Sequence, residues 1–157
     1  MRPRPAAGGH YFAYGSNLSS ARMRKRVPSA RAVCAATLDD HQLTLGKPGR
    51  DGSGKATLVR VPGALCWGVV YAIDTDEWDL LDACEPGYGR TSRIVTTVAR
   101  ERLAVETYLA PATAPDPVAT PLYKSFIVDG AREHGLPADY VGSLERLPVR
   151  REPDGLS

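Results

Sequence analysis

The stretch Tyr11-Phe-Ala-Tyr-Gly-Ser-Asn-Leu18 carries the most information about the fold. Its aromatic run begins at His10 and predicts a first strand over residues 10–14, which runs into a turn at Gly15-Ser16-Asn17. A strand that ends in such a turn exposes backbone N–H groups and two small polar side chains. These groups can form a concavity that binds a carboxylate or an oxyanion. A plain turn with no ligand is the alternative interpretation.

The chain after this turn predicts one short helix and then several strands. Ser19 or Ser20 can cap a basic helix that runs to Arg26 and stops at Pro28. Four strand segments follow, with a mobile, Gly-rich loop expected over residues 47–55. They are 32–38 and 42–45, expected to pair as a hairpin, and 56–61 and 65–73, expected to turn at Pro62-Gly63.

The second half of the chain adds helices. Residues 74–85 predict a helix with Trp78, Leu81 and Cys84 on one face, ended by Pro86-Gly87. Two strands over 91–98 and 103–109 come next, followed by helices over 122–134 and 137–147. Strands outnumber helices and mostly adjoin as hairpins. We therefore expect an α+β fold with a curled, mostly antiparallel, small barrel-like sheet and packing helices.

The 157 residues fit one ordinary domain. We expect this domain over residues 10–149, with a disordered N-terminal leader over 1–9 and a flexible tail over 150–157. No apolar segment follows the basic residues of the leader, so it does not resemble a secretion signal.

Charge and composition exclude several classes of protein. A net charge of +2 argues against a dedicated nucleic-acid binder. The longest apolar run, residues 64–73, is about half the length of a membrane-spanning helix. The three cysteines have no C-x-x-C spacing, and the three histidines have no ligand spacing, so neither a disulfide framework nor a metal site is expected. A cytoplasmic location follows, and the 16 arginines against 4 lysines favour a GC-rich bacterium.

A pair of acids near the end of the predicted helix is a candidate for proton transfer. Asp82 and Glu85 stand three residues apart, so a helix would place them on one face. Like charge would then raise the pKa of the less solvated carboxyl toward neutrality, where it can accept and return a proton. Pro86 would fix Glu85 at a rigid junction. A solvated helix face is the alternative.

Several motifs together resemble the γ-glutamylcyclotransferase family. The first is Tyr11-Phe-Ala-Tyr-Gly-Ser-Asn-Leu18 with Arg22 and Pro28-Ser-Ala30. The others, in the same order along the chain, are Cys66-Trp-Gly-Val-Val-Tyr71, Leu81-Asp82-x-x-Glu85, Thr107-Tyr-Leu109, Pro121-x-Tyr123-Lys124 and Gly130-Ala-Arg-Glu-x-Gly-Leu-Pro137. The resemblance covers residues 11–147.

The resemblance implies a cofactor-free enzyme that releases an amine from a γ-glutamyl compound and cyclises the glutamyl part to 5-oxoproline. It implies that Glu85 is the general base and acid. It also implies that Tyr14, Gly15, Ser16, Asn17 and Leu18 hold the glutamyl group, and that Tyr123 lines the pocket unless it is a core tyrosine. The partner implied is a small γ-glutamyl molecule, with no nucleic acid and no membrane, and relatives that are dimers allow a homodimer.

Two departures from the family pattern affect the leaving-group side of the pocket. Pro86 stands where relatives usually have Gly, and Ser92 where they commonly have Tyr, so Tyr88 is a possible substitute. A γ-glutamyl-protected biosynthetic intermediate, such as an acylated aminoglycoside, is an alternative substrate. A non-catalytic ligand-binding module is the alternative function.

Two further features are interpreted as structural. The basic cluster Arg22, Arg24, Lys25 and Arg26 could contact phosphate or RNA, but the balanced total charge favours a solvated helix face. Cys84 could pair with a histidine as a nucleophile, but packing is the simpler interpretation.

Overall fold

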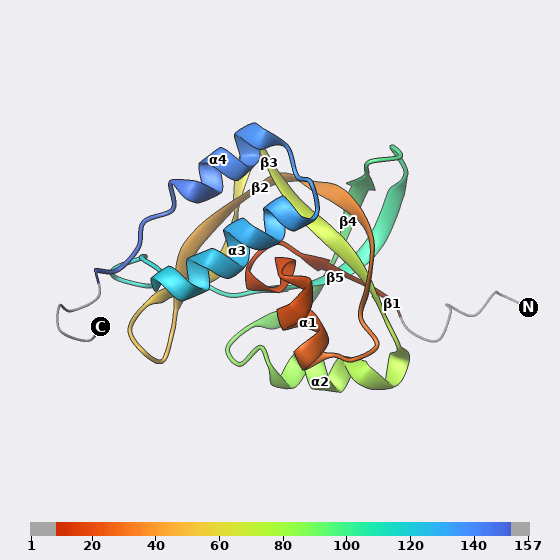
Figure 1. Cartoon of the computed structure of the whole chain (residues 1–157), viewed down its shortest axis with the longest axis horizontal. Coiled ribbons are helices and arrows are strands. Elements are labelled where there is room, and N and C mark those ends of the chain that lie inside the picture. Colours follow the sequence, from red (N-terminus) through yellow and green to blue (C-terminus); the bar gives the residue numbers. More distant parts are fainter. Residues whose placement is uncertain (1–8, 152–157) are drawn as a thin grey trace, which may run out of the picture.

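The computed structural model describes residues 9–151, and its centre is a closed barrel of five strands in the order β1-β3-β2-β4-β5 (Figure 1). The strands are β1 (Gly9–Ala13), β2 (Arg31–Pro48), β3 (Gly54–Ile73), β4 (Gly89–Thr97) and β5 (Arg102–Leu109). Neighbours are antiparallel except β1 and β5, whose parallel contact at Tyr11 and Glu106 closes the barrel. The α+β class with a curled, mostly antiparallel sheet is confirmed.

The two longest strands differ from the sequence prediction. The segments predicted as a hairpin over 32–38 and 42–45 are one continuous strand, β2, and both pair with β3. Residues 56–61 and 65–73 are likewise continuous in β3. Pro62-Gly63 lies in a bulge opposite Asp40, whose Oδ1 accepts a hydrogen bond from the Gly63 N–H at 2.9 Å. The turn preference of these residues is satisfied by the bulge, because the ladder with β2 continues on both sides of it.

The helices agree more closely with the prediction. They are α1 (Ser20–Arg26), α2 (Trp78–Ala83, after a 3₁₀ turn η2 at Thr75–Glu77), α3 (Pro121–Glu133) and α4 (Ala138–Glu145). Ser19 caps α1 by accepting a hydrogen bond from the Arg22 N–H at 3.3 Å. The helix predicted over 74–85 is shorter than expected, so Cys84 and Glu85 lie just beyond α2. None of the helices in residues 9–151 has the length and apolar character needed to cross a bilayer.

Helices α3 and α4 lie against one side of the barrel, whereas α1 and α2 lie at its lower end (Figure 1). Aromatic side chains fill the region between the barrel and α2. The ring of Tyr11 in β1 stands edge-on to Tyr108 at 5.8 Å and to Trp78 at 6.4 Å, and it stacks on Tyr71 at 6.3 Å. This aromatic core fixes the end of β1, from which the turn of interest begins.

The boundaries predicted for the domain fall near the limits of the described chain. Residues 1–8 of the predicted leader lie outside the described residues, and Gly9 begins β1, where it pairs with Ile73. Residues 152–157 of the predicted tail also lie outside. Arg150 still belongs to the folded part, because its N–H donates to the Ala119 carbonyl.

Candidate active site

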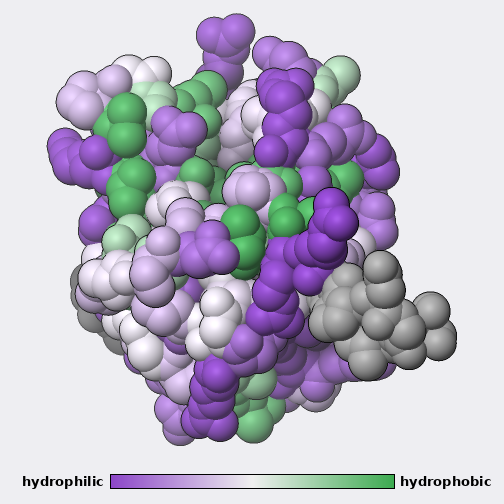
Figure 2. All heavy atoms as spheres, turned by 90° about the vertical axis from the view of Figure 1, so that its left-hand side faces the viewer, coloured by the Kyte–Doolittle hydropathy of each residue, from purple (hydrophilic) through white to green (hydrophobic). Residues whose placement is uncertain are grey.

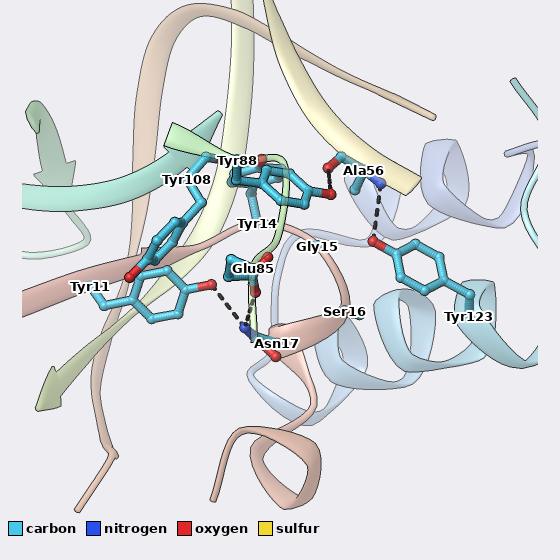
Figure 3. A pocket seen from close by; sticks show the side chains of 10 residues that line it. All are labelled: Tyr11, Tyr14, Gly15, Ser16, Asn17, Ala56, Glu85, Tyr88, Tyr108 and Tyr123. Atoms are coloured by element: carbon cyan, nitrogen blue, oxygen red, sulfur yellow. Dashed lines mark hydrogen bonds between the residues drawn. The ribbon is translucent and has the colours of Figure 1, made fainter. Parts of the chain in front are cut away.

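The turn after β1 is the 3₁₀ turn η1 (Ser16–Leu18), which follows Gly15. Its first hydrogen bond runs from the Leu18 N–H to the Gly15 carbonyl at 3.0 Å. The N–H groups of Ser16 and Asn17 therefore have no acceptor within the turn. Gly15, Ser16 and Asn17 line a cleft together with Tyr14 (Figure 3). A β-carbon at Gly15 would lie 3.0 Å from the Ala56 side chain, so this close approach favours glycine.

Leu18 has a different place from the other residues of the turn. Its side chain is fully buried, its N–H is used inside η1, and it does not line the cleft. Gly130 of α3 lies directly against it, because a β-carbon at Gly130 would stand 2.4 Å from the Leu18 carbonyl carbon. Leu18 therefore anchors the turn to α3.

Glu85 lies at the centre of the cleft, between Tyr11 and Tyr108 on one side and Tyr123 on the other (Figure 3). Its side chain is 13% exposed. Asn17 bridges the wall of the cleft to this carboxylate: its Nδ2 donates to Glu85 Oε1 at 3.3 Å and to the Tyr11 hydroxyl at 3.0 Å.

The electrostatic surroundings of Glu85 suit a proton carrier. Burial raises the pKa of Glu85, whereas the positive charge of Arg26 and the hydrogen bond from Asn17 lower it. The Arg26 guanidinium lies 3.2 Å from Oε1. Burial is the largest of these effects, so the net shift of the pKa is upward, toward the range in which a carboxyl group both accepts and returns protons.

The predicted pairing of Asp82 with Glu85 on one helix face is wrong. Helix α2 ends at Ala83, and the Asp82 carboxylate accepts a hydrogen bond from the Tyr108 hydroxyl at 2.5 Å and lies 3.8 Å from Arg90. Burial, not a neighbouring carboxylate, raises the pKa of Glu85. Asp82 does not line the cleft and instead holds Tyr108, which does.

Five tyrosines form most of the remaining wall: Tyr11, Tyr14, Tyr88, Tyr108 and Tyr123. Burial raises the pKa of each, so their hydroxyls stay protonated. The backbone of Ala56 fixes two of them, because its carbonyl accepts from the Tyr88 hydroxyl at 2.7 Å and its N–H donates to the Tyr123 hydroxyl at 3.0 Å.

Tyr88 and Ser92, the two positions beyond Glu85 that were compared with the family pattern, lie in different places. Tyr88 lines the cleft, whereas Ser92 points to Glu106 on the neighbouring strand and takes no part in the wall. The Tyr123 hydroxyl accepts a hydrogen bond from the Ala56 N–H, and the side chain also lines the cleft. Tyr123 can therefore be both a packed tyrosine with a satisfied hydroxyl and a lining residue of the pocket.

A second cavity of about 550 Å³ adjoins the cleft, and the two share Ser16, Glu85, Tyr88 and Tyr123 as lining residues. Its walls come from α1, the β2–β3 hairpin, the turn after α2 and the start of α3. The β2–β3 hairpin, the turn after α2 and the start of α3 lie on the left of Figure 1, and the corresponding face in Figure 2 is mostly hydrophilic. This outer cavity connects the site to solvent.

Several residues of the site were missed by the sequence analysis. Tyr11, Tyr108 and Ala56 line the cleft, and Arg22 and Arg26 line the outer cavity. The two arginines were assigned to a solvated helix face, but both are half-buried, whereas their neighbours Arg24 and Lys25 are exposed. Their spacing of four residues, which places them on one side of α1, is the signal that could have revealed them.

Comparisons with known proteins agree with this architecture. The model of the AIG2-like family matches residues 65–144. The γ-glutamylcyclotransferase of Homo sapiens is 34% identical over 146 residues, covering 87% of this chain and 77% of the relative, and the enzyme of Mus musculus is 34% identical over 149 residues.

Solved structures lead to the same family. A structure described as a γ-glutamyl cyclotransferase superposes with a TM-score of 0.87 at 30% identity, covering 96% of this chain and 94% of that chain. An uncharacterised human protein superposes with a TM-score of 0.85 at 33% identity, with the same coverage. The chain therefore belongs to the γ-glutamylcyclotransferases of the AIG2-like family.

Proposed function

We propose that this γ-glutamylcyclotransferase uses Glu85 as its only proton carrier. The α-amine of a bound γ-glutamyl compound attacks the γ-carbonyl carbon of the same molecule. A new carbon–nitrogen bond closes the five-membered ring of 5-oxoproline, and the original amide bond breaks to release an amine. The position of Glu85, buried between the turn η1 and the tyrosine wall, is the observation that carries the proposal.

Much of the rate enhancement comes from holding the substrate in a folded shape. The nucleophile and the carbonyl belong to one molecule, and well-oriented intramolecular reactions reach effective molarities of about 10⁵–10⁸ M. The rigid tyrosine wall suits this task, because the hydroxyls of Tyr88 and Tyr123 are fixed to one backbone unit at Ala56.

The proton path needs one carboxylate. Glu85 accepts a proton from the attacking amine and then donates it to the departing nitrogen, so it ends the cycle as it began. Its raised pKa makes the carboxylate a stronger base toward the attacking amine, and the protonated carboxyl group is still acidic enough to return the proton to the departing nitrogen.

The turn η1 supplies donors for the glutamyl group. The N–H groups of Ser16 and Asn17 have no acceptor within the turn, so they are available to donate hydrogen bonds to the glutamyl group. The cleft has a volume of only about 30 Å³, room for roughly two water molecules. A γ-glutamyl group therefore extends from the cleft toward the outer cavity.

The two alternatives fit less well. A bulky leaving group such as an aminoglycoside would fit a cavity of about 550 Å³, but its positive charges would meet basic walls. A non-catalytic module would hold Glu85 in an ion pair with no open space beside η1. The ion pair with Arg26 exists, but the cleft beside Gly15 is open to the carboxylate.

The proposal is tested by incubating the purified protein with a panel of γ-glutamyl amino acids and γ-glutamyl amines. Cyclisation releases 5-oxoproline and the free amine, whereas simple hydrolysis would release glutamate. We expect 5-oxoproline without glutamate. Glutamate as the main product, or no product from any member of the panel, would overturn the proposal.

We also propose a reducing compartment such as the cytoplasm, because Cys34, Cys66 and Cys84 are all free thiols. The homodimer stays a prediction.

A further inference from the structure

The outer cavity concentrates positive charge. Five basic side chains line it, against two carboxylates, Asp51 and Glu85; the basic residues are Arg22, Arg26, Lys47, Arg50 and Lys55. The cavity thus holds three more positive than negative charges, whereas the whole chain has a net charge of only +2. The positive field of the protein is therefore local to this cavity.

Two of these cations are held in place but not neutralised. Within residues 9–151, Arg22 and Lys47 form no ion pair with a carboxylate. The Arg22 guanidinium lies over the Phe126 ring at 4.6 Å and donates to Ser16 Oγ at 3.2 Å. The Lys47 ammonium lies 5.1 Å from the centre of the Tyr88 ring. Both side chains are half-buried and line the cavity. Within the described residues, they therefore present positive charge to the cavity without a carboxylate partner.

A third cation, Lys55, is only weakly paired. Its ammonium lies 3.9 Å from Asp51, which Arg150 also approaches at 3.9 Å. It lies 4.5 Å from the centre of the Tyr123 ring, at the boundary between the outer cavity and the cleft. Burial, and then the neighbouring Arg22, Arg150 and Lys47, lower the pKa of Lys55 despite Asp51. An anion in the cavity would relieve this crowding of positive charge.

The cations stand on the side of Glu85 where the leaving group must lie. If η1 holds the glutamyl group so that its γ-carbonyl reaches Glu85, the atoms beyond the amide nitrogen lie in the outer cavity. Arg22 of α1 approaches them from one side, and Lys47 and Lys55 of the β2–β3 hairpin from another.

Given the proposed function, we propose that the preferred leaving group is an acidic amino acid, with its α-carboxylate and side-chain carboxylate bound by Arg22, Lys47 and Lys55. A single carboxylate would leave at least one of these cations without a partner, and a cationic leaving group would be repelled. The reaction is unchanged: the amine nitrogen of the acidic amino acid departs with the proton that Glu85 carries.

The test compares γ-glutamyl-glutamate with γ-glutamyl-glutamine, which differ in the charge of one group at nearly the same size. We expect kcat/KM for the acidic substrate to be about tenfold higher, the effect of one charge-assisted hydrogen bond. The ratio should fall toward one in about 0.5 M salt, which screens charge–charge attraction. It should also fall at least about threefold in Lys47→Met and in Lys55→Met. Lys25→Met, an exposed change on α1, is the control that should leave the ratio unchanged.

The outcomes separate this inference from the function on which it rests. Equal kcat/KM values for the two substrates, with 5-oxoproline released from both, would overturn the inference and leave the proposed function standing. A preference for the acidic substrate that neither lysine variant reduces would overturn the assignment to this cavity. Release of 5-oxoproline from neither substrate, nor from the wider panel, would overturn both.

Discussion

Burial and two hydrogen-bond donors act in opposite directions on Glu85. Burial raises its pKa, and Arg26 and Asn17 lower it, with burial the larger effect. A general base must be ionised, so activity is lost as the pH falls through this pKa. The acid limb of the kcat/KM profile should therefore lie above pH 4.5, the ordinary value for a glutamic acid.

The substitution Arg26→Gln tests how the positive charge of Arg26 shifts the pKa of Glu85. It removes the first of the influences that lower the pKa of Glu85, so the acid limb should move to higher pH. Rates of 5-oxoproline release from about pH 4 to about pH 9 measure the limb in both proteins. Arg24→Gln, an exposed change on the same helix, is the control. A limb that stays in place or moves to lower pH in Arg26→Gln would contradict this electrostatic account.

Part of the site was predictable residue by residue. Gly15, Ser16 and Asn17 form a recognisable turn after an aromatic strand, and Glu85 stands at a helix end marked by proline. Tyr11 and Tyr108 were not assigned to the site, because they meet only when the parallel contact between β1 and β5 closes the barrel. No local spacing in the sequence encodes that contact.

At the scale of elements, the contact between α3 and η1 positions the site. Gly130 has no side chain, and a β-carbon there would stand 2.4–2.6 Å from Leu18 and the Ser19 nitrogen, all atoms of the turn or its flank. Gly130→Ala must push α3 away from η1, so we expect a loss of about 1–3 kcal/mol in the free energy of unfolding. The displaced donors of Ser16 and Asn17 should also lower kcat/KM.

Gly142 in α4 supplies a matched control. An added β-carbon there would meet only the end of the Arg146 side chain at 3.6 Å. Gly142→Ala should leave kcat/KM unchanged and stabilise the protein by up to about 1 kcal/mol, because alanine favours a helix interior. Urea unfolding and 5-oxoproline assays measure both variants. Equal stability of Gly130→Ala and the wild type would show that α3 does not fix the turn.

The elements themselves were predicted unevenly. Short segments with local stop signals, such as α1 after Ser19 and α3 before Gly135, agree with the structure. The long strands β2 and β3 do not, because Pro62-Gly63 and Asp40 favour turns locally while the ladder between the strands extends past them. Pairing over a long distance in the sequence outweighs the local preference there.

At the scale of the whole molecule, one barrel brings together groups from distant parts of the chain. The turn after β1, the end of α2 and the start of β3 meet at one cleft, and α1 and the β2–β3 hairpin surround its mouth. The small net charge of the chain gave no sign of this basic mouth, since the excess of positive charge becomes local only on folding. The turn η1 offers backbone dipoles to the substrate, and the fold adds a positive field at the mouth of the cleft.

Removing the negative charge of Glu85 at the centre of this cleft should not lower the stability of the protein. Because burial raises the pKa of Glu85, the native state binds more protons than the unfolded chain between pH 4.5 and the raised value. The contribution of Glu85 to stability therefore falls as the pH rises through this window. At neutral pH the ionised side chain opposes folding, so Glu85→Gln should unfold at the same temperature as the wild type or higher.

The rate of 5-oxoproline release by Glu85→Gln at neutral pH tests the central claim most directly. The amide keeps the size of the side chain but cannot accept the proton of the attacking amine. We expect kcat to fall by about 10²–10⁴-fold, the usual contribution of a general base or acid, with the melting temperature maintained. A Glu85→Gln protein that releases 5-oxoproline at the wild-type rate would contradict the account.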